Sequence, residues 1–268
     1  MTDLAVLLPA VKQAALDACR CFKRMPDLKV RNKGPNDFVT QIDLEISAYL
    51  CAELPKLLAD SQVLSEERKE VLSPSPYRWI IDPIDGTNNL VYDLPLYAVS
   101  IGLLLEKQPL LGVVYLPAAG ELFSAVRKGG AFVENPLTGS AGRPIRVNTA
   151  DRLSQAIVMA ETDPYFDREK NPSLDLIKKV YAHCVDLRIT GSAAVDLSYI
   201  AAGRAMVHFC RNLNPWDYAG GGVILTEAGG ILSQWDGSPV PYEGKHTSLG
   251  ASSRPIHEAM LELVRPYM

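Results

Sequence analysis

The sequence predicts an α/β protein built as a layered αβαβα sandwich, with a mainly antiparallel sheet in the N-terminal half and a mixed sheet in the C-terminal half. Between residues 62 and 134, short apolar runs follow one another with Gly or Pro between several of them, as in a meander. From residue 155 onward, strand-like runs alternate with helical patterns, as in βαβ units. The turn-rich stretch 134–150 separates the two patterns, and we place a boundary at residue 147. This gives halves of 1–147 and 148–268.

Two helices are expected before the first sheet. The first lies within residues 1–22 and has Thr2 or Asp3 as its cap. Its inward positions are expected to be Leu4, Leu8, Val11, Ala15 and Ala18. The second helix is expected over residues 37–58.

Composition excludes some functions. The 268 residues carry a formal charge of −4 and a pI near 5.6, so direct binding of nucleic acid is not expected. The apolar N-terminus lacks a basic segment and is interrupted by charged residues, which argues against a signal peptide or a membrane partner. Five cysteines without such a signal favour reduced thiols in the cytoplasm.

The stretch Trp79–Leu90, WIIDPIDGTNNL, ends an apolar strand-like run with two aspartates. Asp82 and Asp85 repel each other unless one is protonated or a cation lies between them. Closely spaced carboxylates suit Mg²⁺, which keeps waters for a substrate phosphate. Gly86 and Thr87 then begin a helix whose free N–H groups favour a phosphate. The alternative is a turn in which one Asp caps the helix and the other is solvated.

Two further acidic positions follow similar patterns. Glu66 comes directly after a short apolar run, and Asp217 follows Trp216 where a later helix opens. Each also has a simpler interpretation: Glu66 and Glu67 as a solvated pair, and Asp217 as an ordinary helix cap.

Taken together, these motifs resemble the inositol monophosphatase family of lithium-sensitive, Mg²⁺-dependent phosphatases. The resemblance rests on Asp43, Glu66-Glu67, Asp82–Thr87 (DPIDGT), Trp216-Asp217 and Gly229-Gly230, in this order. It implies two or three Mg²⁺ ions bound by the side chains of Glu66, Asp82, Asp85 and Asp217 and by the backbone carbonyl of Ile84. It further implies that Asp43 and Thr87, with Glu66, orient and activate a water that attacks the phosphate.

The resemblance also implies a set of substrate contacts and a homodimer. Lys33 matches a lysine on a loop near the third metal position, or is a solvated cation of a turn. Arg188 matches an arginine near the substrate or the subunit contact. The expected substrate-binding residues are Asp85, Gly86, Thr87, Asn88, Arg188, Ser192, Ala193, Cys210, Asn214 and Asp217.

The chain departs from the family pattern where the substrate's alcohol is bound. The family places a glutamate seven residues before the Asp of Trp-Asp and a basic residue three before it, but these positions are Cys210 and Asn214. A small phosphate monoester is the expected substrate, with inositol 1-phosphate first. NADP, 3'-phosphoadenosine 5'-phosphate, fructose 1,6-bisphosphate and histidinol phosphate stay open. A regulatory or binding protein on the same scaffold is the alternative of another class.

Overall fold

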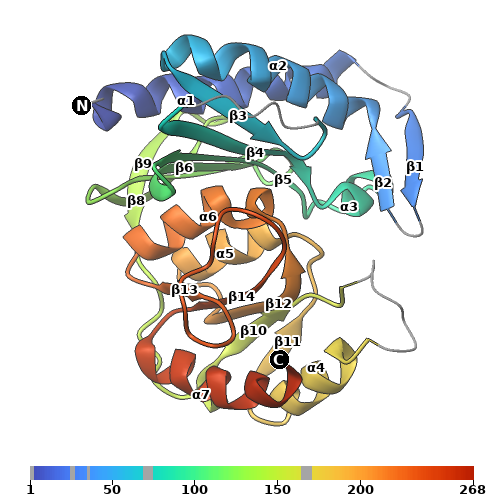
Figure 1. The fold of residues 1–268 in the computed structure, drawn as a ribbon, viewed down its shortest axis with the longest axis vertical. Helices are drawn as coiled ribbons and strands as arrows, with labels where there is room; N and C mark the ends of the chain where they lie inside the picture. Colours follow the sequence, from blue (N-terminus) through green and yellow to red (C-terminus); the bar gives the residue numbers. More distant parts are fainter. Residues whose placement is uncertain (1–2, 25–27, 35–36, 69–74, 164–170) are drawn as a thin grey trace.

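The computed structural model describes residues 3–24, 28–34, 37–68, 75–163 and 171–268. Its elements form five layers (Figure 1). Helices α1 (Leu4–Ala18) and α2 (Gln41–Leu57) cover one face of the first sheet, and α5 (Ala193–Ala201) and α6 (Pro215–Glu227) lie between the two sheets. Helices α4 (Ser173–Tyr181) and α7 (Arg254–Val264) cover the far side of the second sheet. The predicted αβαβα sandwich is therefore confirmed.

The first sheet has seven strands in chain order, β3 to β9. Among its described strands, only β3 and β4 pair in parallel, and each later neighbour is antiparallel, which confirms the predicted meander. The strands are β3 (Ser61–Ser65), β4 (Tyr77–Asp85), β5 (Ala98–Leu105), β6 (Gln108–Leu116), β7 (Glu121–Val126), β8 (Gly130–Asn135) and β9 (Ser140–Ile145).

The second sheet has five strands in the order β11-β10-β12-β14-β13. Strand β10 runs parallel to both of its neighbours, whereas β14 is antiparallel to β12 and β13, so the sheet is mixed as expected. The strands are β10 (Ile157–Ala160), β11 (Asp186–Arg188), β12 (Val207–Leu213), β13 (Ile231–Ser233) and β14 (His246–Ala251).

The N-terminal helices differ from expectation in detail. Asp3 caps α1 by accepting from the Ala5 N–H, while Thr2 lies outside the described residues. The helix predicted over 37–58 starts only at Gln41, because the Thr40 side chain accepts from the N–H groups of the first turn and ends the preceding strand. Residues before it form a hairpin of β1 (Val30–Gly34) and β2 (Asp37–Thr40).

The buried face of α1 is also turned slightly from its predicted position. Leu7, Val11, Ala14, Ala15 and Ala18 are buried, while Leu4 and Leu8 are only partly buried against the same core. Short 3₁₀ turns complete the chain: η1 (Cys19–Arg24), η2 (Leu153–Gln155) and η3 (Arg265–Tyr267). Among the described helices, none combines the length and the apolar composition needed to cross a membrane.

Close packing of α6 holds the two halves together. A Cβ on Gly112 of β6 would lie 2.2 Å from the Gly220 carbonyl oxygen of α6, and a Cβ on Gly220 would lie 2.7 Å from the Ser100 hydroxyl. Only glycine permits this approach. Although β9 ends at Ile145, near the proposed boundary at 147, a helix of the second half thus packs directly on the first sheet. Asp217 in the first turn of α6 is carried to the strand ends of the first half.

Candidate metal centre

The site begins where β4 ends. The ladder between β4 and β5 is regular up to Asp82 and shifts in register between Asp82 and Asp85. Gly86 then takes a left-handed conformation with φ of 90° and starts the short helix α3 (Thr87–Val91). A Cβ on Gly86 would lie 2.8 Å from the Leu96 carbonyl oxygen, so this turn requires glycine. Both aspartates are buried at the strand end, 1% and 9% exposed.

Asp217 approaches this pair from α6, in the layer between the two sheets. One oxygen each of Asp82, Asp85 and Asp217 lie within 4.8 Å of one another. Oδ1 of Asp82 is buried without a hydrogen-bond partner. Burial raises the pKa of Asp82 well above its usual value, and the negative charges of nearby carboxylates, Glu66 first, raise it further. An all-oxygen set with an unpartnered buried carboxylate fits a hard divalent cation such as Mg²⁺.

Asp85 is held in place from the second half of the chain. Its Oδ2 accepts from the Ser192 hydroxyl at 2.7 Å and from the Ala194 N–H at 2.6 Å, at the start of α5. Burial raises the pKa of Asp85 to about 6, although these two hydrogen bonds oppose the shift. Ser192, which is expected to contact the substrate, donates a hydrogen bond to Asp85, an expected metal ligand.

Asp217 and Glu66 complete the acidic set. Oδ2 of Asp217 accepts from the Asn214 N–H at 2.7 Å at the start of α6. Burial raises the pKa of Glu66 to about 7, although the Lys33 charge opposes the shift. Lys33 Nζ lies 3.1 Å from Glu66 Oε1 and also pairs with Glu67. Lys33 lies on strand β1 rather than on a loop, and it is paired with Glu66, an expected metal ligand.

Asp43 and Thr87 form a linked pair beside the aspartates. Oδ1 of Asp43 accepts from the Thr87 hydroxyl at 2.9 Å, and Oδ2 accepts from the Thr40 N–H at 2.9 Å. The Thr87 hydroxyl also lies 3.0 Å from the Ile84 carbonyl oxygen. Since a hydroxyl has one proton, it donates to one of these acceptors at a time. Burial raises the pKa of Asp43, which is 1% exposed.

A cavity of about 460 Å³ opens over these residues. Its lining includes most of the predicted site residues, namely Glu66, Asp82, Ile84, Asp85, Gly86, Thr87, Asn88, Ala193, Cys210, Asn214 and Asp217. Among the described residues, Asp43, Arg188 and Ser192 do not belong to this lining. Asp43 lies behind Thr87, and half-exposed Arg188 pairs with Asp186 at 2.5 Å.

The lining also contains residues that the sequence interpretation missed. They include Glu161, Asp163, Asn212 and Lys245. Glu161 follows the apolar run Ile157–Ala160 directly, so it shows the same pattern of a carboxylate at a strand end that pointed to Glu66 and Asp82. The signal was present in the sequence.

Comparison with known proteins identifies the family. Residues 2–268 match the family model described as "Inositol monophosphatase family". The chain belongs to the inositol monophosphatase family. It is 36% identical over 264 residues to an inositol-1-monophosphatase of Mesorhizobium japonicum, covering 98% of this chain and 96% of that protein. It is 34% identical over 236 residues to the Nus factor SuhB of Escherichia coli K12, covering 87% and 85%.

Solved structures agree with this membership. The inositol monophosphatase from Anabaena superposes with a TM-score of 0.84 at 28% identity, over 99% of this chain and 97% of that one. A Thermotoga maritima IMPase gives a TM-score of 0.80 at 27% identity, over 97% and 94%. This member of the inositol monophosphatase family thus has the family's fold and an acidic cluster able to hold metal, and its relatives support a phosphatase.

Proposed function

We propose that this family member is a Mg²⁺-dependent phosphomonoesterase that hydrolyses a small phosphate monoester by direct attack of water. One observation carries the proposal. A buried, unpartnered oxygen of Asp82 lies among three converging carboxylates that line an open cavity. Such an arrangement costs free energy unless a cation completes it. A cation held at the floor of a cavity is suited to binding a phosphate.

The residues that would hold two or three Mg²⁺ ions are Glu66, Asp82, Asp85 and Asp217, with the Ile84 carbonyl. Bound there, Mg²⁺ would neutralise charge on the phosphoryl oxygens and lower the pKa of a coordinated water. Thr87 lines the cavity while its hydroxyl donates to Asp43, so it can accept a hydrogen bond from the attacking water at the same time. As Thr87 takes a proton from the water, its own hydroxyl proton would pass to Asp43.

The ester's phosphate would bind against Gly86 and Thr87. The left-handed turn at Gly86 opens α3, whose first backbone N–H groups favour an anion. Inositol 1-phosphate is the first candidate substrate, because a relative named inositol-1-monophosphatase matches 98% of this chain. The cavity of about 460 Å³ is of a size that holds a small ligand. Homodimer formation and inhibition by lithium belong to the same proposal.

A second candidate function is regulatory. Relatives named Nus factor SuhB match most of this chain, so a role through protein contacts has a specific observation in its favour. Such a role does not require turnover at the metal site.

The test is phosphate release from myo-inositol 1-phosphate, 2'-AMP, NADP, 3'-phosphoadenosine 5'-phosphate, fructose 1,6-bisphosphate, histidinol phosphate and phenyl phosphate, each with Mg²⁺ and with EDTA. We expect Mg²⁺-dependent turnover of at least one ester and inhibition by lithium at high Mg²⁺. If folded protein that binds Mg²⁺ hydrolyses none of these esters, the phosphatase proposal fails and the regulatory role is favoured.

A further inference from the structure

Glu161 enters the cavity from the strand beside Cys210. Strands β10 and β12 pair in parallel, with Met159 opposite His208 and Ala160 opposite Phe209. The Glu161 N–H continues the ladder by donating to the Phe209 carbonyl at 3.2 Å. Glu161 is therefore next in register, opposite Cys210. Since side chains alternate along a strand, Glu161, His208 and Cys210 project from the same face of the second sheet.

The two neighbours differ in what they offer a ligand. Cys210 lines the cavity, but burial raises the pKa of its thiol well above the usual value, with the nearby Glu161 charge the next cause. A neutral thiol is a weak acceptor. Glu161 lines the same cavity with a carboxyl group. This wall of the cavity thus has a carboxyl group one strand away from the position occupied by Cys210, and burial together with the charges of nearby carboxylates raises the pKa of this Glu161 group well above its usual value.

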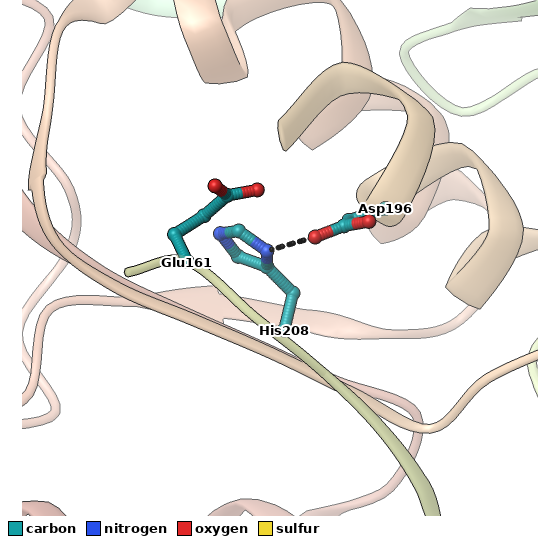
Figure 2. A group of neighbouring side chains, drawn as sticks. All are labelled: Glu161, Asp196 and His208. Carbon is teal, nitrogen blue, oxygen red and sulfur yellow. Dashed lines mark hydrogen bonds and ion pairs between the residues drawn. The ribbon is translucent and has the colours of Figure 1, made fainter. Parts of the chain in front are cut away.

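Glu161 lacks a partner for one of its oxygens. Its Oε1 is buried and accepts no hydrogen bond. Figure 2 shows its side chain beside the His208 ring, with Asp196 on the other side of that ring. A desolvated carboxyl oxygen without a donor costs free energy, and a ligand that brings a donor recovers it.

Asp196 and His208 lie next to Glu161 and are joined to each other. His208 Nδ1 lies 3.0 Å from Asp196 Oδ2, and both side chains are fully buried. The Thr190 hydroxyl donates to the other Asp196 oxygen at 2.5 Å. With Nδ1–H donating to Asp196, His208 Nε2 is an acceptor, and it too is unpartnered. With a neutral imidazole, Glu161 Oε1 and His208 Nε2 are both unpartnered acceptors, so a donor group of a ligand in the cavity would have an acceptor to bind.

These three side chains also lie close enough to be considered as metal ligands, within 4.8 Å. However, both Asp196 oxygens already accept hydrogen bonds, and His208 Nδ1 is occupied by one of them. Glu161 alone of the three lines the cavity. A ligand that enters from the cavity thus meets Glu161 first.

Charge narrows the class of ligand. Apart from the four proposed metal ligands, the described lining has three acidic side chains, Asp37, Glu161 and Asp163, and one basic side chain, Lys245. A second phosphate on the ester would face this acidic wall. A hydroxyl or an ammonium group would find acceptors there.

We propose that Glu161 binds the alcohol portion of the ester by accepting hydrogen bonds from its hydroxyl or ammonium groups, and that His208 and Asp196 position Glu161. The substrate is then a phosphate monoester of a polyol or an amino alcohol, without a second phosphate. This inference rests on the proposed phosphatase activity and specifies its substrate class.

The experiment compares Glu161→Gln with wild type on three esters at saturating Mg²⁺. Myo-inositol 1-phosphate offers hydroxyl donors, histidinol phosphate offers an ammonium group, and phenyl phosphate offers neither. Glu262→Gln, on the exposed face of α7, is the matched control for the same chemical change. Thermal unfolding of each variant verifies that it is folded.

Wild type should turn over at least one donor-bearing ester. For that ester, Glu161→Gln should lower kcat/KM about 10- to 100-fold more than it does for phenyl phosphate, mainly through KM, because one acceptor oxygen becomes an N–H₂ donor that is left unsatisfied against the donors of the ligand. An equal loss on all esters, no loss on any, or wild-type turnover confined to phenyl phosphate or bisphosphates would overturn the inference while leaving the phosphatase intact. Absence of Mg²⁺-dependent turnover of every ester would instead overturn the proposed function.

Discussion

Two buried groups of titratable side chains lie near one another in this protein, and they are completed in different ways. Asp82, Asp85 and Asp217 bring three carboxylates together and leave an Asp82 oxygen unpartnered. The second group is the buried pair Asp196 and His208. Here the His208 imidazole and the Thr190 hydroxyl satisfy both oxygens of Asp196. The comparison teaches that proximity of acidic residues does not by itself indicate a metal. What distinguishes the first group is that three carboxylates converge and Oδ1 of Asp82 has no donor, whereas each oxygen of Asp196 accepts a hydrogen bond.

Their places in the fold explain the difference. The first group joins the end of β4 in one sheet to the start of α6 in the middle layer, where the chain leaves a cavity. His208 lies inside β12 and Asp196 inside α5, where both are fully covered by packing. A site at the ends of elements can accept a ligand, whereas a pair enclosed between layers serves structure.

The largest effect should come from Asp85→Asn. Loss of a charged ligand forfeits several kcal/mol of charge stabilisation in the transition state, so we expect kcat/KM to fall about 10³-fold or more. The fold should persist, because the amide oxygen can still accept from Ser192 and Ala194. Steady-state kinetics over a range of Mg²⁺ concentrations tests this. Normal Mg²⁺ dependence with retained turnover would remove Asp85 from the metal centre.

Smaller effects are expected on stability, and they should have opposite signs for Asp196→Asn and Asp82→Asn. In EDTA, Asp196→Asn should lower the free energy of unfolding by about 1–3 kcal/mol, because an amide cannot accept from both His208 and Thr190 and still leaves its own N–H₂ to satisfy. Asp82→Asn should raise the melting temperature in EDTA by removing one of several like charges. Denaturation of both variants measures this contrast. If both substitutions destabilise equally, the two groups do not differ as described.

The mildest effect concerns pH. Without metal, burial raises the pKa values of Glu66 and Asp85 to about 7 and about 6, above the usual values for unfolded chains. Their protonated forms favour the folded state, so their contribution is present at low pH and is lost as pH rises through these two values. The melting temperature in EDTA should therefore fall from about pH 4.5, near the unfolded pKa values, to about pH 7, by about 2–4 °C for each kcal/mol lost. Saturating Mg²⁺ should abolish the fall, since Mg²⁺ binds the ionised carboxylates. A flat EDTA profile would contradict the raised pKa values.

Much of the architecture could be predicted from local patterns. Apolar runs between Gly and Pro revealed the meander, and the alternation of runs and helical patterns revealed the second sheet. The hairpin before α2 was missed because Asp37–Thr40 reads as the first turn of a helix until the capping role of Thr40 is known. Strand β9 was missed because its sequence, SAGRPI, carries turn-forming residues and only its last residue is buried.

The site could be predicted only as far as motifs extend. Carboxylates at strand ends led to Glu66, Asp82 and Asp85, but Glu161 carries the same signal and was passed over because no motif surrounds it. The role of Ser192 as a support for Asp85 depends on a contact between residues 107 positions apart. Such contacts follow from packing of the layers, which no local window of sequence contains.

The close approach of α6 to the first sheet has a consequence for how variants of this protein are interpreted. Because Gly112 and Gly220 set the spacing between helix and strands, they also set how far the carboxylate at the head of that helix stands from its partners on β4. Replacing either glycine by alanine would push α6 away from the first sheet and displace Asp217 with the helix. Such a variant would lose turnover because the distance between Asp217 and the carboxylates of β4 had changed, although no residue of the site had been substituted.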